Sequence, residues 1–267
     1  MEKNRSNVNY IIYCTIIKSN TNKMQVIKSK NVNIENVSFG EPKVNAKYKN
    51  ISVPITYKVN GNSAPFVMQM PKLKAFVGFS TFMGDDAQKV SLPVSIHELA
   101  SDPSHKSLLE FFKNFDEMIV NKVLENPSWI KKKKNTSKQV IEAFYTPCLR
   151  YPKDRDTGEI TDKYPPNLKF KIPTTPEGEV RTRVFGKDKA LVENSREAVV
   201  KGAIVSSLVE CTGIWVVNGK FGVSFRALQL KIDSVPQIDA YGFIDDSDDE
   251  EDNMSEADSD FSSEDEE

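Results

Sequence analysis

Flat aromatic rings and positively charged side chains alternate in several short segments of this 267-residue sequence. Aromatic rings can stack on unpaired nucleobases, and lysine or arginine side chains can neutralise the phosphates between those bases. The combination predicts binding of a single-stranded nucleic acid with little dependence on its base sequence. The candidate DNA-binding residues are Lys72, Lys74, Trp129, Lys131, Lys132, Lys133, Lys134, Arg150, Tyr151, Lys169, Lys171, Trp215, Lys220 and Arg226. For the run Lys131–Lys134, a nuclear-localisation signal or a surface loop is an alternative explanation.

The segment around Trp215 allows the most detailed prediction. Residues 203–217 and 220–232 have the composition of strands and flank Asn218-Gly219, a pair typical of a type I′ hairpin turn. A two-residue turn places Trp215 opposite Gly222, on the face that points away from the core. The expected core face carries Ile214, Val216, Phe221, Val223 and Phe225, and the other face carries Trp215, Lys220, Gly222, Ser224 and Arg226.

Two explanations fit a tryptophan beside a glycine and between two cations. The ring can serve as a stacking platform for a base, or a helix or loop can cover it while the cations extend to solvent. After Ala227 the apolar residues change phase, to Leu228, Leu230 and Ile232, which predicts a β-bulge or the end of the hairpin there.

The distribution of charge separates the chain into two parts. The whole chain has 36 basic and 38 acidic residues, and 14 of the acidic residues lie in the last 23 positions, from Asp245 to Glu267. Residues 1–244 therefore hold 36 basic against 24 acidic residues, a net charge of +12. A basic body with an acidic tail is typical of a protein that binds a polyanion, with a tail that occupies the same surface or recruits basic proteins. A tail that only maintains solubility is the alternative.

The elements that must position these residues are mostly strands. Ile51–Val59 followed by Asn60-Gly61 predicts a strand and a hairpin turn, with Pro54 marking an edge or a bulge. Strands are also expected over Gln139–Tyr145 and over Leu168–Ile172, where Lys169 and Lys171 alternate with apolar residues. One clear helix is predicted from the Asp102 cap and Pro103 to about Glu125, and Asn126-Pro127 ends it. Its apolar stripe is Leu108, Leu109, Phe111, Phe112, Phe115, Met118, Ile119 and Val123.

Other classes of function are disfavoured by what the sequence lacks. It contains no phosphate-binding loop and no dinucleotide fingerprint, its two histidines form no metal-binding motif, and no acid–base pair is evident. We expect no enzymatic activity, no metal and no cofactor. The three cysteines, at positions 14, 148 and 211, are far apart and fit a reducing, intracellular setting. No stretch approaches the ~20 apolar residues of a membrane span.

Together these segments resemble the phage-type single-stranded-DNA-binding proteins of podophages and their counterparts in large nucleocytoplasmic DNA viruses. The resemblance covers residues 31–267. Its motifs are Val37-Ser38-Phe39-Gly40-Glu41-Pro42-Lys43, Gln69-Met70-Pro71-Lys72-Leu73-Lys74-Ala75-Phe76, the helix around 111–124, the segments Gly213-Ile214-Trp215 and Lys220-Phe221-Gly222-Val223-Ser224-Phe225, and Ser259-Asp260-Phe261 in the tail. Family tails of the phage type end close to their aromatic residue, whereas six residues follow Phe261 here.

The resemblance implies a mainly β fold with one substantial helix, an OB-fold-like barrel with insertions and a disordered acidic C-terminal tail. The expected divisions are an N-terminal extension (1–30), an OB-fold domain (31–243) and the tail (244–267). The implied function is to coat single-stranded DNA during replication, recombination and repair, as a homodimer whose tail competes with DNA. The tail would contact polymerase, primase or helicase through Asp258, Asp260, Phe261, Glu264 and Asp265.

Two alternatives to this function remain open, and neither is enzymatic. An acidic-tailed chaperone or scaffold for basic proteins would use the tail as its main surface, although a body of charge +12 would repel basic clients. A single-stranded-RNA-binding protein is the other, because OB-folds accept either nucleic acid. The expected location is intracellular, at sites of DNA replication in a host nucleus or a cytoplasmic viral factory.

Overall fold

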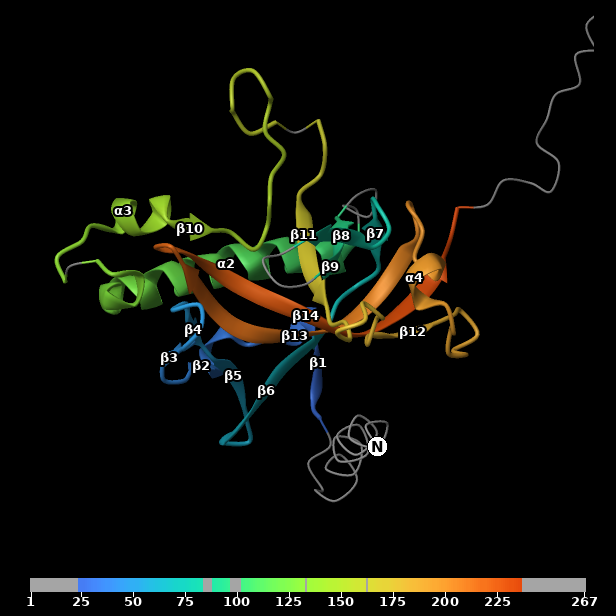
Figure 1. Cartoon of the computed structure of the whole chain (residues 1–267), viewed down its shortest axis with the longest axis horizontal. Coiled ribbons are helices and arrows are strands. Elements are labelled where there is room, and N and C mark those ends of the chain that lie inside the picture. The colour runs from blue at the N-terminus through green and yellow to red at the C-terminus, as the bar shows by residue number, and fades with distance from the viewer. Residues whose placement is uncertain (1–23, 84–87, 97–101, 133, 162, 237–267) are drawn as a thin grey trace, which may run out of the picture. The chain divides into compact units, whose positions relative to one another are not determined.

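Strands dominate the part of the chain that the structure describes, together with one long helix (Figure 1). This computed structural model describes residues 24–83, 88–96, 102–132, 134–161 and 163–236, and all its elements belong to the unit Met1–Val235. The strands are β1 (Val26–Lys28), β2 (Val37–Phe39), β3 (Lys43–Val44), β4 (Ile51–Val53), β5 (Ile55–Val59), β6 (Asn62–Gln69), β7 (Leu73–Ala75), β8 (Ser80–Met83), β9 (Gln88–Ser95), β10 (Tyr145–Thr146), β11 (Asn167–Ile172), β12 (Arg183–Phe185), β13 (Ile204–Val217) and β14 (Lys220–Ser234). The helices are α2 (Pro103–Glu125), α3 (Lys138–Ala143) and α4 (Ser195–Ala198), with 3-10 helices η1 (Ser29–Asn31), η2 (Ile34–Asn36) and η3 (Pro127–Ile130).

Five of the strands close into a ring. β14 pairs with β11, β11 with β9, β9 with β7, β7 with β13, and β13 again with β14. The β11–β14 pair is parallel and rests on a single register position, Lys171 opposite Arg226, whereas the other four pairs are antiparallel. A partly open five-stranded barrel of this kind is the OB-fold architecture. The predicted fold class, mainly β with one substantial helix in an OB-fold-like barrel with insertions, is therefore confirmed.

The β13–β14 hairpin forms as its sequence predicts, and it is the longest hairpin in Figure 1. Asn218 and Gly219 have φ values of 49° and 80°, as a type I′ turn requires. The register pairs Val217 with Lys220 and Trp215 with Gly222. The predicted bulge is present as well, because Val209 pairs with Ala227 and Leu208 with Gln229, so that residue 228 is the extra one. Two further register shifts, at residues 212 and 233, were not predicted.

Helix α2 also matches its prediction and fills the core against the barrel. Asp102 caps it, Pro103 opens it and Asn126 is its C-cap residue. Phe112 packs edge-on against Phe225 of β14, with ring centroids 5.5 Å apart, and Phe115 lies 6.3 Å from Phe66 of β6. The three phenylalanines of the stripe are therefore core residues, and the helix fixes the inner face of the strands whose outer face is discussed below.

The region between α2 and β11 differs from the predicted strand over Gln139–Tyr145. Residues Lys138–Ala143 form helix α3, in which Ile141 is fully buried, and only Tyr145–Thr146 is a strand. Helix α3 lies against α2 and buries Ile141, while Val140 and Ala143 are exposed, so tertiary packing overrode the local strand signal.

Near the N-terminus, β1 lies within the expected extension 1–30 and pairs in parallel with β6. Pro54 separates β4 from β5, where the chain leaves β13 and begins to pair with β2 and β6.

Among the described residues, no helix is both long and apolar enough to cross a membrane.

Candidate nucleic-acid interface

Trp215 lies on the outward face of the hairpin, directly against Gly222. A Cβ atom at Gly222 would be 2.8 Å from Cζ2 of Trp215 and 2.9 Å from the carbonyl oxygen of Thr146. Only glycine fits between the indole ring and strand β10, whose Thr146 pairs with Gly222. The indole is neither fully covered nor fully exposed, so part of its surface remains accessible to a ligand.

The sheet row that contains Trp215 continues toward the edge of the sheet. Ser52 of β4 pairs with Trp215, and Lys43 of β3 pairs with Ser52. Directly paired residues project from the same face, so the exposed Lys43 belongs to the same surface as the indole. At the hairpin tip, the exposed Lys220 lies two residues from Gly222 on this face. The tryptophan thus has a cation on either side.

Strand β10 is held beside Gly222 by a partly buried polar cluster. The carboxylate of Asp116, on α2, accepts hydrogen bonds from the hydroxyl of Tyr145 (2.5 Å) and from the backbone N–H of Cys148 (3.1 Å). Burial raises the pKa of Asp116, and it also raises the pKa values of Tyr145 and Cys148. The cluster joins β10 to the long helix and so fixes the wall on which Trp215 rests.

Lys171, on β11, extends the outward face from β14 to the neighbouring strand β11. Its ammonium group donates to Oγ of Ser224 at 2.7 Å, and Ser224 follows Gly222 by two residues on the same face of β14. Burial of the amine, with Lys89 nearby, lowers the pKa of Lys171. Arg226 lies opposite Lys171, but its guanidinium is paired with the carboxylate of Glu210. Lys171, in contrast, donates to a neutral hydroxyl, and among the described residues no carboxylate forms an ion pair with it.

A second group of cations surrounds Phe82. The ammonium of Lys169 lies 5.0 Å from the centroid of the Phe82 ring, within cation–π distance. Lys89 pairs with Phe82 across β8 and β9 and so lies on the same face. Burial and the nearby Arg150 lower the pKa of Lys169. These four residues, Phe82, Lys89, Arg150 and Lys169, are called the Phe82 cluster below.

Lys74 lies on a row that leads to the Phe82 cluster. It pairs with Ser95 of β9, Ser95 pairs with Asn167 of β11, and Asn167 forms a bridge with Arg150. The register therefore brings Lys74 and Arg150 onto one face, although 76 positions separate them in sequence. Tyr151, next to Arg150, is exposed.

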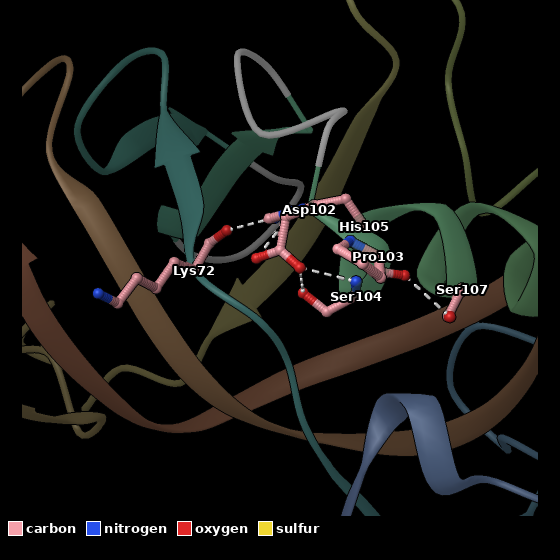
Figure 2. A network of polar contacts seen from close by, with 6 residues as sticks. All are labelled: Lys72, Asp102, Pro103, Ser104, His105 and Ser107. Carbon is pink, nitrogen blue, oxygen red and sulfur yellow. Dashed lines mark hydrogen bonds and ion pairs between the residues drawn. The ribbon is translucent and has the colours of Figure 1, made fainter.

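Lys72 is fixed through its backbone by the start of helix α2 (Figure 2). Nε2 of the buried His105 lies 2.7 Å from the Lys72 carbonyl oxygen and donates to it. Nδ1 of His105 has no hydrogen-bond partner among the residues that the structure describes, and it lies 3.8 Å from the carboxylate of Asp102. Hydrogen bonds from Ser104 hold that carboxylate at the helix start and lower the pKa of Asp102. The Lys72 side chain extends away from this network into solvent.

The lysine run after α2 lies close to the hairpin tip. The Lys132 ammonium is 4.1 Å from the centroid of the Phe144 ring, and the Phe144 carbonyl accepts from the backbone N–H of Phe221. Trp129 packs partly buried against the core, so its ring has mainly a packing role. Lys131 and Lys134 are exposed, and Lys133 lies outside the described residues.

The structure thus assembles half of the fourteen DNA-binding candidates on one outward face and leaves the other half outside it. By register, this face carries Lys74, Arg150, Lys169, Lys171, Trp215, Lys220 and Arg226. Lys72 is fixed at the start of α2, and the run after Trp129 borders the hairpin tip. The tail candidates Asp258, Asp260, Phe261, Glu264 and Asp265 lie outside the described residues.

Sequence reasoning missed three members of this face, Lys43, Phe82 and Lys89. Lys43 and Lys89 were isolated cations without an aromatic neighbour in sequence, so local interleaving gave no signal. The only sequence signal for Phe82 is that it does not lie in an apolar run. Its exposure results from the position of β8 outside the five-stranded ring.

By its fold and its outward face, this protein is an OB-type barrel protein with a cationic and aromatic outer surface. A family model described as a family of unknown function (DUF5871) matches residues 105–245, which is more than half of the chain. The chain belongs to this family. No curated protein matches the sequence.

Several solved structures are similar to this one. The single-stranded DNA-binding protein from bacteriophage Enc34 in complex with ssDNA is 12% identical, with a TM-score of 0.42 over 73% of this chain and 96% of that chain. The same phage protein without its C-terminal segment is 14% identical, with a TM-score of 0.40 over 76% of this chain and 98% of that one. Gp2.5, a single-stranded DNA binding protein encoded by bacteriophage T7, is 12% identical, with a TM-score of 0.37 over 73% of this chain and 100% of that one.

Proposed function

We propose that this protein is a non-enzymatic single-stranded-DNA-binding protein that coats DNA during replication, recombination and repair. The observation that supports this proposal is the continuous outward face of the barrel. Lys43, Trp215, Lys220 and Gly222 form one surface, called the Trp215 surface below. The Lys171–Ser224 hydrogen bond joins the Trp215 surface to the Phe82 cluster. Cations along a groove replace counterions on phosphates, and exposed rings stack on any base.

The acidic tail regulates this face in the proposed function. Residues 1–244 carry +12 and the last 23 carry −14, and a tethered segment acts at a high effective concentration. The tail therefore competes with DNA when the body is empty. It is released when DNA binds, and is then free to contact polymerase, primase or helicase through Asp258, Asp260, Phe261, Glu264 and Asp265. The proposal includes a homodimer that acts at replication sites in a host nucleus or a viral factory.

Fluorescence anisotropy with labelled single-stranded DNA, duplex DNA and single-stranded RNA tests the proposal. The full chain is compared with a truncation that ends at Ile244, across a salt series. Single-stranded DNA should bind best, salt should weaken it with a slope of about −0.7 per phosphate contact, and truncation should tighten it several-fold. If neither the full chain nor the truncated chain binds any nucleic acid at low salt, the proposal fails, and the tail is then tested against basic proteins as a chaperone surface. Preference for RNA over DNA would reassign the protein to the RNA-binding alternative.

A further inference from the structure

Phe82 is an exposed ring on a strand that is fixed in place. The side chain of Phe82 has 47% of its surface exposed, although burial of an aromatic side chain is normally favourable. β8 is held on one side by pairing with β9, and Arg196 donates to Oγ1 of Thr81 at 2.9 Å. The ring therefore belongs to ordered structure, where its exposure requires an explanation other than a loose loop.

The charges around Phe82 suit a phosphate backbone beside a stacked base. Lys169 lies over the ring, Lys89 is its direct partner across the strands, and Arg150 is close enough to lower the pKa of Lys169. Three cations held together repel one another, and a polyanion relieves this repulsion. A base on the Phe82 ring would leave the Lys169 ammonium free to contact the adjacent phosphate.

The position of the ring relative to Trp215 follows from the register. On β14, Gly222, opposite Trp215, and Arg226, opposite Lys171, are four positions apart. Lys171 pairs with Ser91, and Lys89, the partner of Phe82, lies two residues further in the same direction. The two rings are therefore offset by roughly 20 Å along the strands, at about 3.3 Å per residue, and they lie four strands apart. Lys171 lies on the path between them.

We propose that Phe82 is a second base-stacking platform, and that one single strand of DNA runs across the barrel from Trp215 past Lys171 to the Phe82 cluster. This inference rests on the proposed function and adds its path and its second anchor. A strand must be long enough to bridge both rings before it gains from both, within the ~4–16 nucleotides that an OB-fold contacts. Short oligonucleotides can occupy only one platform at a time.

The test measures the affinity of oligo-dT of 4, 8, 12 and 16 nucleotides for the full chain and for Phe82→Leu and Phe82→Trp. Leucine keeps an apolar side chain without a ring, and tryptophan restores a ring. Phe82→Leu should weaken binding of the 16-mer by about 5- to 100-fold, the equivalent of one stacked base, and should change binding of the 4-mer much less. Phe82→Trp should retain wild-type affinity, and the emission of its new indole should be quenched by the 16-mer beyond the quenching seen in the wild type. Phe76→Leu is the matched control, because Phe76 is also exposed, at 39%, but is not paired in register with Lys171 or with any residue of the Phe82 cluster.

The outcomes separate this inference from the proposed function. If the wild type binds the 16-mer and Phe82→Leu binds it equally well, the second platform is disproved while single-strand binding stands. Equal losses for Phe76→Leu and Phe82→Leu would also disprove it. If Phe82→Leu does not fold, the quenching of Phe82→Trp decides alone, and absence of additional quenching rejects the platform. If the wild type binds no single strand, the proposed function fails and this inference fails with it.

Discussion

The Trp215 surface and the Phe82 cluster occupy two regions of one barrel face, but they are built in different ways. Trp215 is positioned by a hairpin in which its partner Gly222 is seven positions away in sequence. The Phe82 cluster combines residues from β8, β9, β11 and the segment before β11, the most distant of which are 87 positions apart. The first region offers mainly a ring and the second mainly charge. Local sequence therefore reveals a site of the first kind and conceals one of the second.

The largest effect is expected from removing two cations of the Phe82 cluster together with Lys171, which lies between the two regions. The triple variant Lys89→Gln, Lys169→Gln and Lys171→Gln loses three phosphate partners. The salt slope of single-strand binding should become shallower by about 2, from ~0.7 per phosphate contact, with a loss in affinity on the order of 100-fold at low salt. Anisotropy titrations between 50 and 300 mM salt measure both quantities.

A matched control for the triple variant is the ion pair between the two regions. Arg226 is already bound to Glu210, so the double variant Arg226→Gln with Glu210→Gln removes both charges and leaves the net charge unchanged. The salt slope should stay within experimental error of the wild type. An equal change in slope for both variants would mean that the slope does not report on the cations around Phe82.

The next effect concerns the ring of the first region. Trp215→Leu should lower single-strand affinity by about 5- to 100-fold, because one base–aromatic stack is worth ~1–3 kcal/mol. The salt slope should not change, since no charge is removed. Trp129→Leu should instead lower the melting temperature with little loss of affinity, because the Trp129 ring packs against the core. A slope change for Trp215→Leu would contradict a role for Trp215 that is limited to stacking.

The same contrast explains what the sequence could predict of the fold. The turn at Asn218-Gly219, the register of Trp215 and the bulge at residue 228 follow from short-range turn chemistry and apolar phase, and each is confirmed. Helix α2 follows from its cap and its apolar stripe. Barrel closure does not, because the parallel β11–β14 pair rests on one register position between residues 55 positions apart.

The same distinction between local and long-range contacts applies to the residues of the candidate site. Lys169 and Lys171 could be predicted to face outward because they alternate with buried residues on β11. That Lys169 lies over Phe82, or that Lys171 contacts Ser224, depends on which strands become neighbours. The strand expected over Gln139–Tyr145 was wrong for a related reason, since residues 138–143 form a helix against α2 and only Tyr145–Thr146 pairs with the sheet.

A smaller effect tests how the first region is held together. Gly222→Ala places a methyl group against Trp215 and the backbone of Thr146, so the protein should lose about 1–3 kcal/mol of unfolding free energy, the usual cost of overpacking. Gly40→Ala is the control, because a Cβ there meets only ordinary contacts at 3.5 Å or more. Urea denaturation of both variants measures the difference. Equal stability of the two would show that the indole moves aside easily and does not rest on Gly222.

The smallest expected effect is a pH dependence that arises from Lys169 in the Phe82 cluster and from the neighbouring Lys171, and not from the Trp215 surface. Burial and neighbouring cations lower the pKa values of Lys169 and Lys171 from the ordinary lysine value of 10.5. A lowered pKa means that these amines lose their protons at a lower pH than an ordinary lysine, and phosphate binding favours the protonated form. Single-strand affinity should therefore fall as the pH rises from neutral toward 10.5, and it should recover as the pH is lowered again.

Lys169→Arg with Lys171→Arg should flatten this profile by a few-fold, because a guanidinium stays protonated throughout. Lys220→Arg at the hairpin tip is the control from the first region. If that substitution flattens the profile as much as the double variant does, the alkaline loss of affinity does not originate in the crowded cations around Phe82.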